Sequence, residues 1–145
     1  MKKSNKRRLD PERETIFIDG KNAILGRLAT FSAKQTLLGK NVIIVNCNDV
    51  VISGRKRKII SEYREMRNKG SPSFRGPFFP KQSHRIVKRT IRGMLAHRQG
   101  RGRAAIRRVR CYDTVPAEYE KSKFLFFENK LKTTIIKLKD LSKEI

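Results

Sequence analysis

A continuous run of mostly β-branched residues, Val42 to Cys47 (VIIVNC), constrains the fold of this chain more than any other stretch. A strand with one face in water alternates apolar and polar residues, whereas an almost unbroken apolar run is typical of a strand covered on both faces of a parallel sheet. Thr15 to Asp19 (TIFID) has the pattern of a second short buried strand. Between them, Ile24 to Leu38 has the apolar periodicity of a mostly buried helix with one narrow polar stripe. Strand, helix and strand in this order predict a right-handed crossover unit and an α/β fold.

Amphipathic periodicity predicts further helical segments after this unit. In the clearest one, from Ser83 to Leu95, one face carries Val87, Ile91, Met94 and Leu95 and the opposite face is basic. The expected elements after Cys47 are a short extended piece at 50–52, a helix at about 55–69, this helix at 83–95, a second basic amphipathic segment at 100–110, and candidate strands at 124–127 and 133–138. The Gly-, Pro- and Ser-rich stretch 70–80 and residues 112–120 are expected to be loops.

The length of the chain favours a single domain. Its 145 residues, 37% of them hydrophobic, are sufficient for one compact core. Residues 1–14 are basic and nearly free of apolar side chains, so we expect a flexible tail there and a folded domain over 15–145. This tail lacks the apolar centre of a signal peptide, and no stretch approaches the about 20 apolar residues of a membrane-spanning helix. We expect a soluble, cytoplasmic protein without a membrane partner.

The metal-ligating residue types do not form a recognisable site. Cys47 and Cys111 lack C-x-x-C spacing, which argues against a zinc site and a disulfide scaffold, and we expect both to be small buried apolar residues. His84 and His97 have no carboxylate or cysteine at ligand spacing, so we expect neither a metal site nor a catalytic dyad. No cofactor is predicted.

Catalytic and nucleotide-binding motifs are equally weak. Gly20 to Arg27 lies between a strand and a helix, where a phosphate loop would be, but five residues separate its two glycines and no Gly-Lys-Ser/Thr follows. A tight turn is the favoured interpretation, with Arg27 near the helix start still placed to contact an RNA phosphate. Ser53, Ser83 and Asp113 have no nucleophile-elbow motif or paired base around them. We therefore predict that the protein is not an enzyme.

Positive charge is concentrated in one stretch of the chain. Of a formal net charge of +23, residues 53–110 carry +17, from 14 Arg and 5 Lys against two Glu, whereas residues 111–145 carry +1. Charged helix faces are usually just solvated, but such faces mix both signs, and like charges spaced i, i+4, such as Arg85 and Arg89, destabilise an isolated helix. Arginine pairs two-pronged with phosphate and stacks on bases. The pattern predicts a polyanion-binding surface, with nucleic acid as the first partner to consider.

Three segments together resemble a known family. ILGRLATFSAKQTLLGK, VIIVNCNDVVISG and RTIRGMLAHRQGRGRAAIRRVRCYDTVP are similar, in order, to the large-subunit ribosomal protein thirteen family in its archaeal and eukaryotic form, over roughly residues 16–116. The matches are Gly26-Arg27 to the family's G-R-L, Ser53-Gly54 to I-S-G, 89–95 to R-T-V/I-R-G-M-L, and Gly102 to R-G. The chain departs from the family at Ala96, where Pro is usual, and at Gln82-Ser83, where S-P is usual. It lacks the long C-terminal helical extension of eukaryotic members, which favours the compact archaeal type.

The resemblance implies an α/β domain with a small, mainly parallel central sheet flanked by helices. It implies a structural constituent that binds large-subunit rRNA in assembly and translation, lies beside neighbouring large-subunit proteins on the ribosome, and has no small-molecule substrate. Joined with the charge pattern, it gives a set of candidate RNA-binding residues. These are Arg27, Arg55, Lys56, Arg57, Lys58, Arg75, Arg85, Lys88, Arg89, Arg92, Arg98, Arg101, Arg103, Arg107, Arg108 and Arg110. The aromatic rings of 71–80 lie between cations, which fits stacking on bases or ribose, although buried Phe is the commoner outcome.

Two alternatives from other classes stay open at the level of sequence. The stronger is a free nucleic-acid-binding regulator, such as a translational repressor or an architectural DNA protein, which co-sedimentation with ribosomes would discriminate. The weaker is an enzyme of nucleotide or RNA metabolism, which ATP binding or turnover would support.

Overall fold

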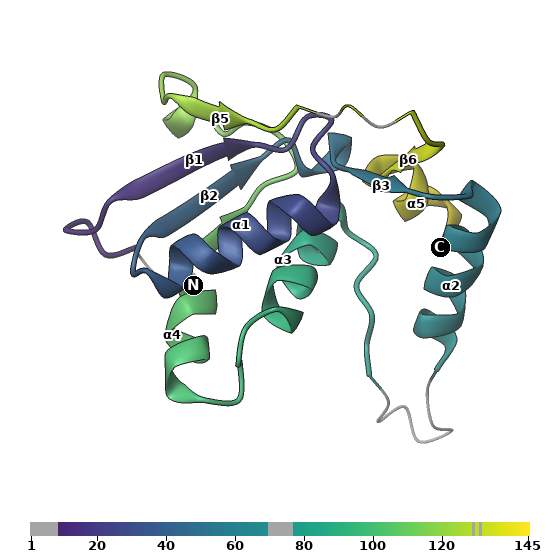
Figure 1. Ribbon diagram of the computed structural model, residues 1–145, viewed down its shortest axis with the longest axis horizontal. Coiled ribbons are helices and arrows are strands. Elements are labelled where there is room, and N and C mark those ends of the chain that lie inside the picture. The colour runs from purple at the N-terminus through teal and green to yellow at the C-terminus, as the bar shows by residue number, and fades with distance from the viewer. Residues whose placement is uncertain (1–8, 70–76, 129, 131) are drawn as a thin grey trace, which may run out of the picture.

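A four-stranded parallel sheet forms the centre of the protein (Figure 1). The computed structural model describes residues 9–69, 77–128, 130 and 132–145. The strands are β1 (Thr15–Asp19), β2 (Asn41–Val45), β4 (Val109–Cys111) and β5 (Phe124–Phe126), in the spatial order β4-β2-β1-β5. Each neighbouring pair in this sheet is parallel. The predicted α/β fold with a small, mainly parallel central sheet flanked by helices is confirmed.

Strand β2 lies between β1 and β4 and is the most buried strand. All five of its residues are buried, which is why its sequence is an apolar run rather than an alternation. Ile16 of β1 is in register with Val42, and Val42 is in turn in register with Val109 of β4. Helix α1 (Leu25–Leu37) connects β1 to β2, so the predicted strand, helix and strand are all present.

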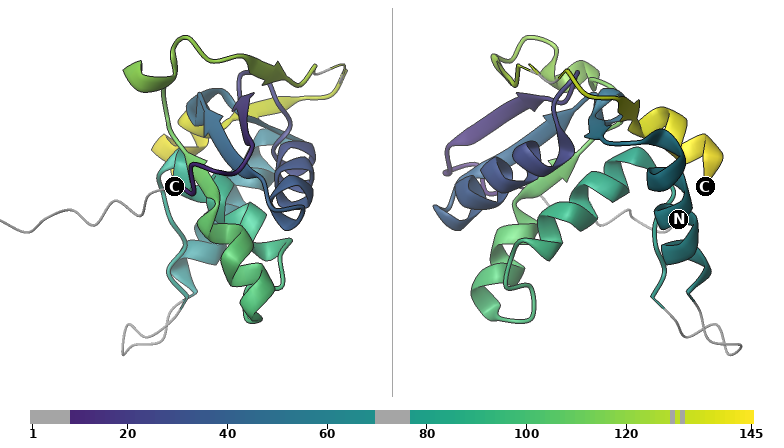
Figure 2. Two further views of the ribbon diagram at one scale, coloured as in Figure 1. Left: turned by 90° about the vertical axis from the view of Figure 1, so that its left-hand side faces the viewer. Right: turned by 45° about the vertical axis from the view of Figure 1, so that its right-hand side comes forward.

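Helix α1 lies over one face of the sheet and packs against α3 (Ser83–Gly93) and α4 (Gly100–Arg107), as Figures 1 and 2 show. Leu28 of α1, Ile86 of α3 and Ile44 of β2 belong to the same buried apolar cluster. On β1, the ring of Phe17 packs against Tyr119, with ring centroids 5.4 Å apart. The core therefore joins both helices of the basic region to the sheet.

A smaller unit lies beside the main sheet. Strand β3 (Val51–Ser53) pairs antiparallel with β6 (Ile135–Lys137), and the helices α2 (Lys56–Asn68) and α5 (Leu138–Glu144) lie side by side next to them (Figure 2). Arg64 Nη2 lies 3.6 Å from a carboxylate oxygen of Glu144, which ties α2 to α5.

Two predicted segments end earlier than the sequence indicated, and each is followed by an element of the other kind. The amphipathic segment predicted over 100–110 is helical only to Arg107, because residues 109–111 pair with β2 to form β4. The strand predicted over 133–138 is limited to 135–137, and α5 begins at Leu138, whose side chain is buried with that of Leu141. Pairing and burial with distant parts of the chain override the local pattern in both places.

Part of the predicted tail and part of the predicted 70–80 loop, residues 1–8 and 70–76, lie outside the described residues. The segment that follows residue 8 contacts the sheet: Asn41 Nδ2 donates to the Asp10 carbonyl at 2.9 Å, and Arg13 Nη1 donates to the Gly39 carbonyl at 3.1 Å. Residues 77–80 have no regular structure, as expected. None of the described helices is long and apolar enough to cross a membrane.

Candidate nucleic-acid interface

Helix α3 separates an apolar face from a basic one. Ile86, Val87 and Ile91 are buried, whereas Arg85 and Arg92 are exposed. The helix ends at Gly93; beyond it Met94, which the periodicity placed on the apolar face, is 44% exposed, whereas Leu95 is buried as the pattern predicted. Burial of one face in the core orients the cations of the other face outward.

Helix α4 and the turn before it extend the basic face of α3. Gly102 and Ala105 are buried, while the flanking arginines are exposed. A Cβ at Gly102 would lie 2.0 Å from the Ala96 carbonyl oxygen, so only glycine permits the close approach of α4 to the preceding turn. We call the resulting cationic region the α3–α4 surface. It consists of Arg85, Lys88, Arg89, Arg92, Arg98, Arg101, Arg103 and Arg107.

The stretch of chain that forms this surface has no carboxylate of its own. Residues 83–110 contain ten Arg and Lys residues and no Asp or Glu. Several ion pairs of the described residues lie elsewhere, for example between Lys40 and Glu14 and between Lys137 and Asp49. Within the described part of the chain, no carboxylate forms an ion pair with an arginine of the α3–α4 surface. An anion arriving from outside therefore meets a field of one sign.

A carboxylate from outside the basic stretch supports the start of α3. Asp113 accepts a hydrogen bond from the backbone N–H of His84 at 2.9 Å, and its other oxygen lies 2.7 Å from the ring nitrogen Nδ1 of His84. The sequence prediction for His84 rested only on carboxylates near it in the chain, whereas Asp113 is 29 positions away and contacts it through the fold. Asp113 caps a helix N-terminus. The described residues contain no group of three or more His, Cys, Asp or Glu side chains arranged to hold a metal ion.

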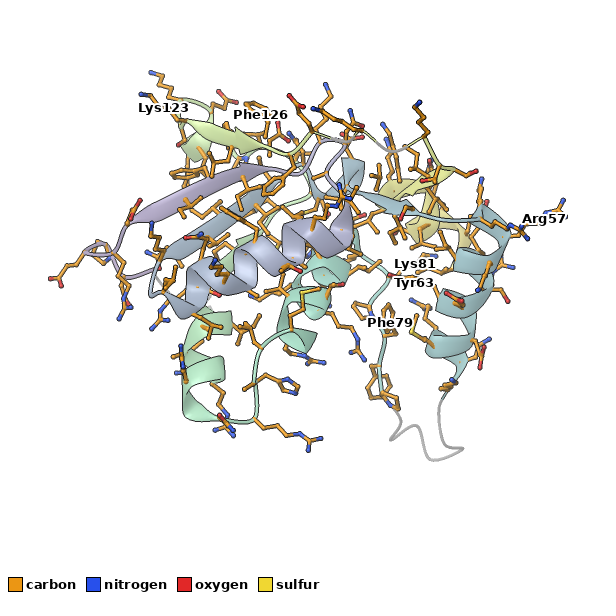
Figure 3. All side chains as sticks on the ribbon, viewed as in Figure 1. Arg57, Tyr63, Phe79, Lys81, Lys123 and Phe126 are labelled. Atoms are coloured by element: carbon orange, nitrogen blue, oxygen red, sulfur yellow. The ribbon has the colours of Figure 1, made fainter. Side chains whose placement is uncertain are left out.

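Aromatic rings lie next to the α3–α4 surface in the segment that leads into α3. The guanidinium carbon of Arg89 lies 4.6 Å from the centroid of the Phe79 ring, and Tyr63 of α2 meets the same ring edge to face at 5.3 Å. Figure 3 shows Tyr63 and Phe79 facing each other between α2 and this segment. Phe79 is half-buried, as the commoner outcome for Phe predicts, but Phe78 is 77% exposed.

The remaining candidates do not all lie on this surface. Arg57, at the start of α2, points outward on the side of α2 away from Phe79 (Figure 3). All four cations of the predicted cluster 55–58 are exposed. Arg27 is exposed on α1, on the same polar stripe as Thr30, whose hydroxyl lies 3.5 Å from the Met94 sulfur. This stripe therefore adjoins the end of α3.

Two candidate cations have structural contacts that sequence reasoning missed. Arg108 is half-buried and donates to the Thr36 carbonyl at 2.9 Å, which ties the end of α4 to α1. Lys88 donates to the Val109 carbonyl at 3.0 Å. Arg110 is half-buried within β4, and Arg75 lies outside the described residues. Lys81, exposed directly before α3, was not among the candidates, although its position next to the basic helix was a usable signal.

The segment between β1 and α1, residues 20–24, is a tight turn, and Arg27 lies in the first turn of α1. The Gly20 N–H donates to the Val45 carbonyl at 2.9 Å, and Asn22 has a positive φ of 57°. A Cβ on Gly20 would lie 2.8 Å from a methyl carbon of Val50. This glycine is thus required for backbone packing, which supports the interpretation as a turn.

The two cysteines are close neighbours with free thiols. Cys47 is fully buried as predicted, but Cys111 is only half-buried. A hydrogen bond with Cys111, together with burial, raises the pKa of the Cys47 thiol far above its usual range. Cys47 therefore stays a neutral thiol and packs as a small apolar side chain.

The fold and its surface define a small α/β domain with one concentrated cationic flank. Residues 13–118 match the family model described as Ribosomal protein L13. The chain is 51% identical over 102 residues to the large ribosomal subunit protein uL13 of Methanosarcina barkeri, covering 70% of this chain and 72% of that protein. It is 41% identical over 131 residues to the uL13 of Picrophilus torridus, covering 88% of this chain and 94% of that protein. The chain belongs to the ribosomal protein L13 family, and its archaeal-type resemblance is confirmed.

Proposed function

We propose that this protein is a structural constituent of the large ribosomal subunit that binds and stabilises large-subunit rRNA, without a catalytic role. Membership of the L13 family supports the place of action, the cytoplasmic ribosome. The arginine-rich α3–α4 surface supports the mode of action, because ten cations in residues 83–110, a stretch without a carboxylate of its own, repel one another unless an anion covers them.

The chemistry of the surface favours recognition of RNA shape over RNA sequence. Double-stranded RNA hides its base edges in a deep, narrow groove, so contacts fall on phosphates and 2′-hydroxyl groups. The guanidinium groups of Arg85 and Arg92 suit this task because each pairs with phosphate through two parallel hydrogen bonds. Each phosphate contact steepens the dependence of log K on log salt by about 0.7 to 0.9.

The candidate cations divide into groups with different roles. The α3–α4 surface is the main RNA contact, and Arg27 extends it because the stripe of α1 that holds it adjoins the end of α3. The exposed cations 55–58 lie at the start of α2, where Arg57 points away from Phe79, and contact a separate RNA segment. Arg108 acts chiefly by positioning α4, since its guanidinium is bonded to the Thr36 carbonyl. The basic residues 1–8 add positive charge that RNA phosphates can neutralise.

Neighbouring large-subunit proteins are the second class of partner. The C-terminal section, residues 111–145, is almost neutral, with seven Lys against six acidic residues. Its strand β5 forms an edge of the sheet and exposes Leu125 and Phe126. An apolar, nearly neutral edge is suited to a protein neighbour rather than to a phosphate backbone.

Sedimentation of a cell lysate through a sucrose gradient tests this function. We expect the protein in large-subunit fractions at a stoichiometric level, retained after a high-salt wash. Its presence only in free fractions or on other nucleic acid would contradict the proposal and favour the free regulator.

A further inference from the structure

A groove of about 310 Å³ opens between the segment before α3 and the α3–α4 surface. Phe78, Pro80 and Ile106 form its apolar walls. Arg85, Arg89 and Arg92 surround these walls, together with Lys88. A volume of this size is at the lower end of those that hold small ligands, so it suits a single planar group better than a folded partner.

Phe78 has the geometry of a prepared stacking platform. Its side chain is 77% exposed, although covering a Phe side chain is worth about 1.5 to 3 kcal/mol. Its neighbour Phe79 is anchored between Tyr63 and Arg89. Arg89 Nη1 also donates to the Phe78 carbonyl at 3.4 Å, which ties the backbone of this position to α3. Because this backbone is already anchored, little conformational entropy is lost at Phe78 when a ligand stacks on its ring.

We propose that this groove binds one unpaired nucleobase of an RNA, stacked on the ring of Phe78, with the flanking phosphates held by Arg85 and Arg92. The inference rests on the proposed function and adds to it a subsite for a base. Charge complementarity selects the occupant: the ligand must combine a flat apolar face with negative charge on both sides, which is the chemistry of a nucleotide within a strand. Stacking accepts any base, because each base has a π-face.

The test uses the full chain and two RNA hairpins of identical stem, one fully paired and one with a single bulged 2-aminopurine. Fluorescence anisotropy gives the affinity for each hairpin, and the 2-aminopurine emission reports stacking of the bulged base. We expect the protein to bind the bulged hairpin about tenfold more tightly, with quenched emission, since stacking on one aromatic ring supplies a factor of this order. Phe78→Ala abolishes the preference and the quenching but keeps the affinity for the paired stem. Phe78→Leu behaves in the same way, because it keeps the apolar bulk and loses the ring.

Phe126→Ala is the matched control, since Phe126 is 72% exposed and lies on β5, away from the groove. This variant keeps the preference for the bulged hairpin. Equal affinity of the unmodified protein for both hairpins, or a preference that survives Phe78→Ala, overturns the inference while RNA binding stands. Failure to bind either hairpin overturns the proposed RNA binding itself. Displacement of the bulged hairpin by a free mononucleotide at comparable concentration overturns the assignment of the groove to a base within RNA.

Discussion

The α3–α4 region and the C-terminal section, residues 111–145, differ in the balance of their positive and negative side chains. The first contains ten cations and no carboxylate within residues 83–110, whereas the second contains seven Lys and six acidic residues. Carboxylates of the second form ion pairs with nearby cations, such as Glu144 with Arg64. A region that compensates its own charge is complete in solution, and one that does not is built for a partner of opposite sign.

The same two regions also differ in what apolar surface they expose. In the C-terminal section, β5 presents Leu125 and Phe126 on a sheet edge. Beside the α3–α4 surface, the exposed ring of Phe78 lies among cations instead. Under the proposed function, the first region contacts the polyanionic backbone of RNA and the second contacts an apolar, nearly neutral protein face. The variants below test this difference.

Charge reversal on the α3–α4 surface has the largest expected effect. Arg85→Glu combined with Arg92→Glu removes two exposed cations and adds two repulsive charges. Each charge-assisted hydrogen bond to phosphate contributes about 1.5 kcal/mol or more, so RNA affinity falls on the order of a hundredfold. The slope of log K against log salt decreases by about 2. Titration of rRNA fragments at several salt concentrations measures both quantities.

Lys121→Glu combined with Lys123→Glu is the control, because it changes the net charge equally within the C-terminal section. Its RNA affinity stays much closer to that of the unmodified protein. Equal losses for the two double variants would mean that only total charge matters, and would remove the distinction between the regions. We do not reverse Arg89 here, because its contact with the Phe79 ring adds a packing effect to the charge effect.

Gly102→Ala tests whether the α3–α4 surface depends on the placement of its two helices. The added Cβ would lie 2.0 Å from the Ala96 carbonyl oxygen, a backbone atom that moves only if the turn moves. We expect a loss of about 1 to 3 kcal/mol in the free energy of unfolding, measured by urea denaturation. Gly100→Ala in the same helix meets no atom within 4 Å and should be neutral or slightly stabilising. Equal behaviour of the two variants would contradict the packing argument.

Much of the fold follows from local sequence, and the exceptions have one cause. The apolar run of β2 predicts its strand because both of its faces are buried. The apolar and basic residues of α3 predict its helix because they alternate with the helical period. Strand β4 was missed because a three-residue strand carries almost no periodic signal and forms only when β2 is there to pair with. The start of α5 was missed because it depends on burial of Leu138 and Leu141 against distant parts of the chain. The resemblance to a family indicated which residues form the domain, but it did not indicate where β4 and α5 begin.

For the candidate surface, sequence identified the cations but not their orientation. Arg108 has the same local setting as Arg107, yet it donates to a carbonyl 72 residues away and is half-buried. The cluster 55–58 lies at the start of another helix, α2, where Arg57 points away from Phe79. Which cations share one face depends on how α2, α3 and α4 pack, and no pattern within a single helix contains that information.

Asp113→Ala tests a carboxylate of the C-terminal section that contacts the start of the basic helix α3. It removes the acceptor of the His84 N–H in the first turn of α3, as well as the partner of the His84 ring. We expect a loss of about 1 kcal/mol in the free energy of unfolding, as for other N-terminal caps. RNA affinity should not fall, because a negative charge is removed next to a cationic surface. Asp113→Asn, which keeps an acceptor oxygen, should lose less stability; equal losses in both variants would assign the effect to charge alone.

Phe126→Ser has the smallest expected effect on the isolated protein and tests the other side of the comparison. The side chain is already mostly exposed on the sheet-edge strand β5, so its removal takes little apolar surface out of the core, and the free energy of unfolding should change by no more than about 0.5 kcal/mol. Affinity for protein-free rRNA fragments should also be unchanged. The variant should nevertheless be under-represented in large-subunit fractions when it competes with the unmodified protein in cells, because an apolar contact that is complete only beside a protein neighbour is lost. Incorporation at the level of the unmodified protein would show that β5 does not bind a protein neighbour. The two regions would then differ in charge alone, and not in the kind of partner that they bind.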